Sequence, residues 1–281
     1  MMTQTRTLGP TEARLLNQLA ADGHVIFSTT QARVALGKGR NINKLLYHLA
    51  RKRWLLRLER GKYLILPLEA GMEGLYSVHE FVVAAHLVQP YAIAYASALS
   101  FHALSNLMPH TVFVATTRRK VEVSVEELGL RFQFVTLASH KFFGLQTVTI
   151  EDQPVRITTP SKTLVDGLDR PDLCGGIVEL VKGLSRYAGA DADASTDSGR
   201  RWAQLTADAQ QLGNRTVFKR LGYLAQVLGL DAGEWIDRWR VEISSGETLL
   251  DPRYGYRGSY HSEWNLRLNV NEEQLLEWRG H

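Results

Sequence analysis

GKGRNINKLLYHLARKRWLLRLERGKYLIL, the stretch from Gly37 to Leu66, contains two different apolar patterns in succession. In its first half, apolar side chains recur at positions i, i+3, i+4 and i+7, which places them on one face of an α-helix. They are Ile42, Leu45, Leu46 and Leu49. Because such a helix is stable only when its apolar face is buried, we expect it to pack against other helices.

The second half of the stretch has the pattern of a β-hairpin. Residues 55–58 and 63–66 favour strands, and the turn residues 59–62 between them include Gly61. The switch from a helical period to two short apolar runs therefore predicts a helix followed directly by a hairpin.

Two further helices are predicted ahead of this stretch. The first begins at Pro10 and stops at Gly23, and the second begins after a capping residue, Ser28, and stops at Gly37. Together with the third helix and the hairpin they form a winged helix-turn-helix, which we assign to residues 1–70.

Positive charge is concentrated in the same quarter of the chain. Residues 1–67 contain 12 Lys and Arg against 3 Asp and Glu, a net charge of +9, whereas the whole chain carries +4, so the remainder carries −5. This asymmetry favours a module that binds a polyanion, joined to a body with another task. The alternative is a basic surface that is merely solvated.

The polar face of the third helix can donate many hydrogen bonds and contains no acidic residue. Its early residues suit base edges in the major groove of DNA, where Arg favours guanine and Asn favours adenine. The predicted contacts of this helix are Arg40, Asn41, Asn43, Lys44, Tyr47, His48, Arg51 and Lys52.

Contacts with the DNA backbone are predicted from two neighbouring elements. Lys and Arg attract phosphates whatever the sequence, and hydroxyl and amide groups also bind them. The candidates are Arg57, Arg60 and Lys62 on the hairpin, and Thr29, Thr30, Gln31 and Arg33 at the start of the second helix.

A second basic patch follows a predicted strand further along the chain. It consists of Arg118, Arg119 and Lys120. The patch is a candidate extension of the DNA footprint or a contact for a partner, and a solvated loop is the alternative.

Residues 71–281 have the mixed pattern of an α+β body. Segments such as 111–117 and 130–137 have strand patterns, and helical patterns precede and follow them. The fold class is therefore predicted to be α+β, with the winged helix followed by a mixed body. The body is one domain, or is divided near residue 160 into a mixed part and a mainly helical part.

Signals for helix starts recur in the second half of this body. Ser161 is predicted to cap one helix, and Pro171 is predicted to open the next. Residues 188–199 are small and acidic without apolar periodicity, so we expect a loop there.

Common motifs for catalysis or metal binding are missing from the sequence. It contains no His-Glu-x-x-His, no Walker A sequence and no Gly-x-Ser-x-Gly, and Cys174 is its single cysteine. The Asp/Glu-x-Lys element of restriction-type nucleases is also missing. We therefore expect a protein that is not an enzyme and uses no cofactor or metal. The alternatives are a nucleic-acid-processing enzyme targeted by a winged helix, and a winged-helix module for protein contacts.

The sequence also bears on location. Residues 1–10 lack the apolar region of a signal peptide, and no later run approaches the roughly 18 apolar residues of a spanning helix. A single cysteine fits a reducing compartment. We expect a cytoplasmic protein that does not bind a membrane.

Several segments resemble the AbiEi antitoxins of type IV toxin-antitoxin systems, which are also transcriptional regulators. The wing segment RGKYLIL is similar to theirs, and AYASALSFHAL resembles their Ser-Ala-Leu-x-x-His helix. The most specific similarity is ITTPSKTLVDGLDRPDLCGGIVEL, with LLDP and WNLRLNV near the end of the chain. The resemblance covers nearly the whole chain.

The resemblance implies a function in two parts. The winged helix would bind inverted repeats in its own promoter and repress its operon, and the body would neutralise a cognate nucleotidyltransferase-like toxin without needing a stable complex. Two copies on one repeat would place half-sites about 34 Å apart, or a multiple of that distance.

Residues of the most specific segment have a structural interpretation as well. Thr163, Leu164, Asp166, Arg170 and Gly176 belong to it, and Asp166 and Arg170 are four residues apart, as in helical ion pairs. We expect this pair to stabilise a helix.

Overall fold

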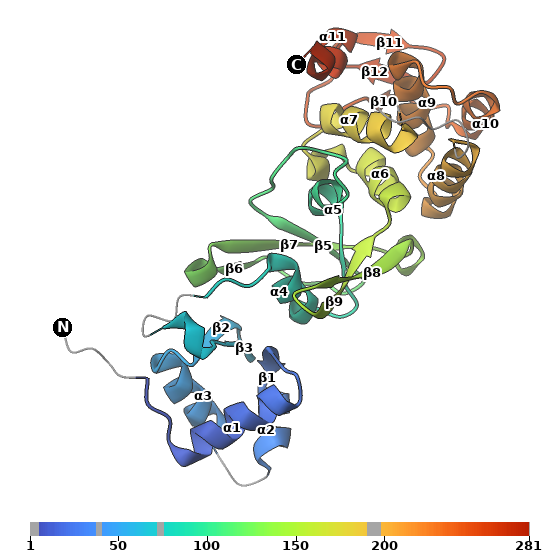
Figure 1. Cartoon of the computed structure of the whole chain (residues 1–281). Coiled ribbons are helices and arrows are strands. Elements are labelled where there is room, and N and C mark those ends of the chain that lie inside the picture. The colour runs from blue at the N-terminus through green and yellow to red at the C-terminus, as the bar shows by residue number, and fades with distance from the viewer. Residues whose placement is uncertain (1–5, 38–40, 72–75, 190–197, 281) are drawn as a thin grey trace. The chain divides into compact units, whose positions relative to one another are not determined.

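The computed structural model of the chain describes residues 6–37, 41–71, 76–189 and 198–280 (Figure 1). The chain divides into two compact units, which are Met1–Gln89 with Val123–Arg131, and Pro90–Glu122 with Phe132–His281. The domain boundary at residue 70 stays a prediction, because compactness alone does not show which part folds independently.

The first unit begins with the helices and the hairpin that the sequence predicts (Figure 1). In chain order these elements are α1 (Pro10–Ala21), β1 (Ile26–Ser28), α2 (Thr29–Leu36), α3 (Ile42–Arg51), β2 (Leu55–Glu59) and β3 (Lys62–Ile65). This order matches the predicted winged helix-turn-helix pattern.

Local capping interactions determine where α2 and α3 begin. Ser28 Oγ accepts a hydrogen bond from the Gln31 N–H at 3.2 Å, and Gln31 Oε1 accepts one from the Ser28 N–H at 2.7 Å. At the start of α3, Asn41 Oδ1 accepts from the Lys44 N–H at 3.1 Å. These bonds satisfy amide groups that have no partner within the helix, so the predicted cap at Ser28 is confirmed.

A small sheet completes this part of the unit. Its strand order is β1-β3-β2, and β3 is antiparallel to both neighbours. A bulge between Arg57 and Glu59 interrupts the pairing of β2 with β3 just before the turn. The hairpin β2–β3 is called the wing below.

The apolar faces of the helices meet the sheet in one core. Leu15, Leu19, Leu46, Leu49 and Phe27 are each at most 1% exposed. Burying one such side chain contributes roughly 1.5–3 kcal/mol. Burial of Leu46 and Leu49 therefore sets which face of α3 points outward.

Further elements of the first unit follow later in the chain. They are η1 (Leu68–Ala70), α4 (Glu80–Leu87), β6 (Val123–Val125) and η2 (Glu126–Leu128). Lys62 Nζ of the wing donates a hydrogen bond to the Leu87 carbonyl oxygen at 2.5 Å, which ties α4 to the sheet.

The second unit contains a larger sheet. The strands β7 (Leu130–Thr136), β5 (Val112–Thr116), β4 (Ala92–Ile93), β9 (Gln153–Thr158) and β8 (Leu145–Ile150) lie in this order. The pairs β5–β7 and β4–β9 are parallel, whereas β4–β5 and β8–β9 are antiparallel.

Helices and a second, smaller sheet make up the remainder of this unit (Figure 1). The small sheet has the order β10 (Thr248–Leu249), β12 (Leu266–Leu268) and β11 (Ser259–His261). The helices are α5 (Tyr95–Phe101), η3 (Ser139–Lys141), α6 (Pro160–Asp169), η4 (Pro171–Cys174), α7 (Ile177–Ala188), α8 (Ser198–Leu212), α9 (Thr216–Leu228), α10 (Glu234–Glu242), α11 (Glu272–Leu276) and η5 (Glu277–Gly280). The predicted α+β fold class is confirmed.

Three details of the body differ from the sequence-based predictions, and the first is a helix cap. Helix α6 begins at Pro160, and Thr159 rather than Ser161 is its N-cap, with Thr159 Oγ1 accepting from the Lys162 N–H at 3.4 Å. Proline fits the first helical position because its missing N–H would have no partner there. Ser161 is instead buried within the first turn.

The second difference is a break after Pro171. The segment begins as a short 3₁₀-helix, and Gly175 and Gly176, with φ of 77° and 98°, separate it from α7. Side chains with a Cβ rarely adopt such angles, so the glycine pair ends one helix and allows a new start at Ile177. There, the Ile177 N–H donates to Asp251 Oδ2 at 2.9 Å.

The third difference concerns ion pairs. Asp166 pairs with Lys162, and Arg170 pairs with Asp172, so the predicted Asp166–Arg170 pair is wrong. Arg170 lies beyond the last residue of α6 and has left the helical path. The loop predicted at residues 188–199 falls outside the described residues except at its ends.

Candidate nucleic-acid interface

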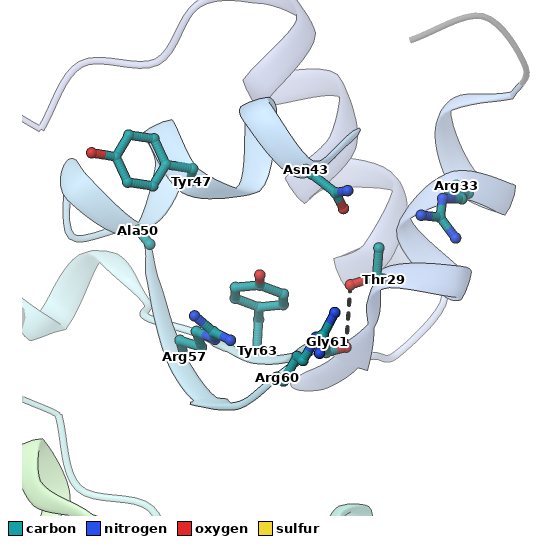
Figure 2. Close-up of a pocket in the computed structure, with 9 residues that line it drawn as sticks. All are labelled: Thr29, Arg33, Asn43, Tyr47, Ala50, Arg57, Arg60, Gly61 and Tyr63. Carbon is teal, nitrogen blue, oxygen red and sulfur yellow. Dashed lines mark hydrogen bonds between the residues drawn. The ribbon is translucent and has the colours of Figure 1, made fainter. Parts of the chain in front are cut away.

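A hollow of about 600 Å³ lies between α3 and the wing, as Figure 2 shows. We call it the wing groove. Its lining combines cationic, amide, hydroxyl and aromatic side chains from α2, α3 and the wing. The lining residues are Thr29, Arg33, Asn43, Tyr47, Ala50, Arg57, Arg60, Gly61 and Tyr63.

One wall of the wing groove is the outer face of α3. Because Leu46 and Leu49 are buried in the core, the helical period turns Asn43 and Tyr47 outward. Tyr47 is 58% exposed, so its ring is open to the wing groove. The guanidinium of Arg51 lies 5.9 Å from the centre of its ring.

The opposite wall and the floor come from the wing. In β2, Leu56 and Leu58 are buried while Arg57 between them is exposed, as the alternation of a strand requires. Tyr63 of β3 is half-buried, and its ring stacks on Phe27 with centroids 5.8 Å apart. Figure 2 places the Tyr63 ring between Tyr47 and Asn43 on one side and the wing arginines on the other.

The turn of the wing is held against the start of α2. The Gly61 carbonyl oxygen accepts hydrogen bonds from the Thr29 N–H at 2.9 Å and from Thr29 Oγ1 at 3.3 Å. Gly61 has φ of 82°, a value that glycine adopts without steric cost. The wing therefore keeps a defined position relative to α2 and α3.

Every charged side chain among the described residues that line the wing groove is an arginine. They are Arg33, Arg57 and Arg60, which are exposed and have no ion-pair partner in the part of the chain that the structure describes. Arg57 Nε donates to the Glu59 carbonyl oxygen at 3.3 Å. These guanidinium groups are thus available to an external anion.

Other predicted contacts use their polar atoms inside the protein. Lys52 Nζ donates to both carboxylate oxygens of Glu12, at 2.9 and 2.7 Å. Burial raises the pKa of the Glu12 carboxyl, but hydrogen bonds from Lys52 and from the Gly9 N–H outweigh burial and leave that pKa below its usual value. The predicted contact of Lys52 with DNA stays a prediction. Its ion pair with Glu12 disfavours that contact, because the ammonium group is already engaged.

Lys62 is likewise engaged within the first unit. Its ammonium group lies 3.0 Å from Glu59 Oε1 and also donates to the Leu87 carbonyl oxygen. The side chains of Gln31 and Asn41 are capping groups of α2 and α3. Sequence reasoning missed these partners because it assigned every basic residue of the wing and every amide of the helix starts to DNA.

The remaining predicted residues have different surroundings. Thr30 and Lys44 are exposed, His48 is half-buried with its ring 5.7 Å from that of Tyr47, and Arg40 lies outside the described residues. The second basic patch belongs to the second unit, where Arg118 and Arg119 are exposed and Lys120 Nζ lies 5.3 Å from the centre of the Phe134 ring. None of the three lines the wing groove.

Sequence reasoning also missed residues that the wing groove brings together. Tyr63, Ala50 and Gly61 line it, and none of them was a predicted contact. Strand alternation carries a usable signal for Tyr63, because Leu64 beside it is fully buried and neighbouring side chains point to opposite faces.

Two other kinds of site are absent from the described residues. No three or more of their His, Cys, Asp and Glu side chains are grouped so that they could hold a metal ion. None of their helices is both long enough and apolar enough to cross a membrane.

Comparison with known families identifies the segment that builds the wing groove. Residues 14–65 match the family model described as "Transcriptional regulator, AbiEi antitoxin". This range includes all of α2, α3 and the wing. The resemblance to AbiEi antitoxin regulators is confirmed over these residues.

Comparison with solved structures extends the fold to the whole chain. The crystal structure of the RV2827C protein from Mycobacterium tuberculosis has a TM-score of 0.64 with this chain at 16% identity, covering 99% of this chain and 97% of that chain. At this identity the similarity shows the fold alone. No curated protein matches the sequence.

Proposed function

We propose that this protein is a cytoplasmic DNA-binding repressor and antitoxin that regulates its own operon. The observation that carries the proposal is the wing groove, whose arginines have no ion-pair partner among the described residues. It lies within the segment that matches the AbiEi antitoxin regulators. A DNA duplex is the polyanion that such a surface between a helix and a hairpin fits.

The chemistry of α3 supports a division between reading and positioning. Asn43 and Lys44 are exposed in its first turns, and both can donate hydrogen bonds to base edges in a major groove. The arginines of the wing groove suit phosphates, which carry no sequence information. Repression then follows when the bound protein covers its promoter, with two copies on an inverted repeat.

Support for the antitoxin half comes from the family similarity. The toxin would be a nucleotidyltransferase-like enzyme, neutralised by the body without a stable complex, and the protein would act by binding rather than by catalysis. The family model matches only residues 14–65, so the body's part in neutralisation rests on the resemblance of its own segments.

The test of DNA recognition compares two duplexes. The purified chain is titrated with its own upstream region and with a scrambled duplex of equal length across a salt series. We expect specific binding that weakens steeply with salt. Asn43→Ala should lose about 1–3 kcal/mol on the upstream duplex and little on the scrambled one. Equal affinity of the unaltered protein for both duplexes at every salt would reject sequence-specific repression.

The antitoxin half needs a separate experiment. The gene of the proposed toxin is expressed with the intact chain, with Arg57→Met/Arg60→Met, or alone, and growth is followed. We expect rescue by both forms of the chain, because neutralisation is assigned to the body. Failure of the intact chain to restore growth would reject the antitoxin role, and magnesium-dependent cleavage of DNA by the purified chain would favour the enzyme alternative.

A further inference from the structure

The wing groove contains more than a set of positive charges. Guanidinium groups stand at its wing wall and at the start of α2, and a tyrosine ring with a hydroxyl forms its floor. We propose that the wing groove holds the sugar-phosphate backbone of one DNA strand, with Tyr63 donating its hydroxyl to a phosphate. This inference rests on the proposed function and assigns the role of that same surface in detail.

Tyr63 is suited to be a fixed donor at the floor. Its ring stacks on Phe27 at an interplanar angle of 24°, and it is half-buried, so the direction of its hydroxyl is set by packing. Within the described residues the hydroxyl has no hydrogen-bond partner. A donor that is rigid and unused in the free protein loses little conformational entropy when it binds.

The arginines surround this donor from two elements. Arg57 and Arg60 come from the wing, and Arg33 comes from α2. The bond between Thr29 and Gly61 holds the wing turn against α2, so the arginines of both elements face the same space (Figure 2). A guanidinium group matches the geometry of phosphate oxygens with two parallel N–H bonds.

The donor-rich lining favours a backbone over base edges. Phosphate oxygens only accept hydrogen bonds, whereas base edges present both donors and acceptors. With α3 in a major groove and the wing beyond it, the strand that borders that groove must pass between the two. The wing groove is the space between them.

This arrangement predicts that removing an arginine and removing the tyrosine hydroxyl weaken DNA binding in two distinguishable ways. An arginine that neutralises a phosphate releases counterions from DNA when it binds. Its removal should therefore make affinity less sensitive to salt, with the magnitude of the negative slope of log affinity against log salt smaller by about 0.9. A tyrosine hydroxyl carries no charge. Its removal should reduce affinity at every salt concentration and leave the slope unchanged.

The experiment measures affinity for a random-sequence duplex over a salt series, so no operator is needed. The variants are Arg33→Met, Arg57→Met, Arg60→Met and Tyr63→Phe, and the control is Arg14→Met. Arg14 is exposed on α1 and does not line the wing groove. Tyr63→Phe retains the ring that packs on Phe27, so its fold should be preserved, and circular dichroism checks each variant.

We expect each groove arginine variant to lower the salt slope by about 0.9, and Tyr63→Phe to bind about tenfold more weakly at unchanged slope. The control should behave like the unaltered protein. If the unaltered protein binds DNA but the groove variants match the control, the inference is wrong and DNA binds another surface. If Tyr63→Phe alone keeps full affinity, the floor contact is wrong. If the unaltered protein binds no duplex, the proposed function itself fails.

Discussion

Thr29 donates its backbone N–H to the Gly61 carbonyl oxygen at 2.9 Å, and this bond joins the start of α2 to the turn of the wing. The residues are far apart in the sequence, so the bond is a tertiary contact. It holds the turn of the wing beside α2, and both elements line the wing groove.

The first prediction follows from the backbone of Gly61. Its φ of 82° is costly for a residue with a Cβ, so Gly61→Ala should strain the turn by about 1–2 kcal/mol. A displaced wing should bind the specific and the scrambled duplex more weakly by a similar factor, because backbone contacts are lost. Fluorescence anisotropy measures both affinities.

Gly23 supplies the matched control for this substitution. It has φ of 74° after α1 and lies outside the wing groove, so Gly23→Ala should strain the chain similarly without changing DNA affinity. Equal loss of affinity in both variants would mean that general destabilisation, and not the position of the wing, weakens binding.

The second prediction separates two cations that are close in the sequence. Arg60 is free to bind a phosphate, whereas Lys62 is engaged by Glu59 and by the Leu87 carbonyl oxygen. We therefore expect Arg60→Met to lower the salt slope of DNA binding and Lys62→Met to leave it unchanged, although the loss of its partners should destabilise the hairpin. A slope that falls by about 0.9 in Lys62→Met would support the assignment made from sequence.

These residues illustrate what the sequence could and could not predict. Periodicity and capping signals are local, so the boundaries of α2 and α3 and the hairpin followed from residues such as Ser28 and Gly61. The partner of Lys52 is Glu12 on another helix, and that of Lys62 includes a carbonyl oxygen of α4. A cation's availability depends on such long-range contacts, which no local pattern contains.

In the body, too, local features could be predicted from the sequence and long-range or backbone features could not. Strand patterns predicted the positions of β5 and β7, since alternation and β-branched residues are local features. The break at Gly175 and Gly176 was missed, because the apolar pattern of a helix continues through the two glycines. Their positive φ angles, which end the helix, cannot be read from that pattern. The wing groove, lined from α2, α3 and the wing, could be recognised only once those elements were assembled.

The third prediction concerns pH and the pair of Glu12 with Lys52. The pKa of Glu12 is lowered in the folded protein, so the pair's stabilisation is present above the unfolded-state pKa of about 4.3 and is lost as pH falls through the folded-state value. Lys52→Met should cost about 1 kcal/mol near neutral pH, since the pair is only partly exposed.

Amide hydrogen exchange in α1 measures this effect where it arises. The difference between Lys52→Met and the unaltered protein should shrink as the pH falls through the lowered folded-state pKa of Glu12, because Glu12 then becomes protonated in both. A difference that stays constant across this range would show that Lys52 stabilises α1 through the packing of its stem instead.

The fourth prediction concerns a buried ion pair in the second unit. Lys162 and Asp166 form a salt bridge on α6 with side chains 1% and 2% exposed, and Lys162 Nζ also lies 4.5 Å from the centre of the Phe143 ring. Burial raises the pKa of Asp166 to about 6, against the opposing effect of Lys162. The cost of removing both charges from water is therefore only partly offset by their attraction.

Removing one partner of this ion pair should destabilise the second unit more than removing both. Lys162→Met or Asp166→Leu alone should lower the free energy of unfolding of the second unit by about 3–5 kcal/mol, because each change leaves the other buried ionisable group without its partner. The double variant Lys162→Met/Asp166→Leu should lose less than either. Denaturant unfolding followed by tryptophan fluorescence measures all three, since Trp239 and Trp264 are buried in the core of this unit. A double variant that loses the sum of the single effects would mean that each side chain stabilises the body independently through its own packing.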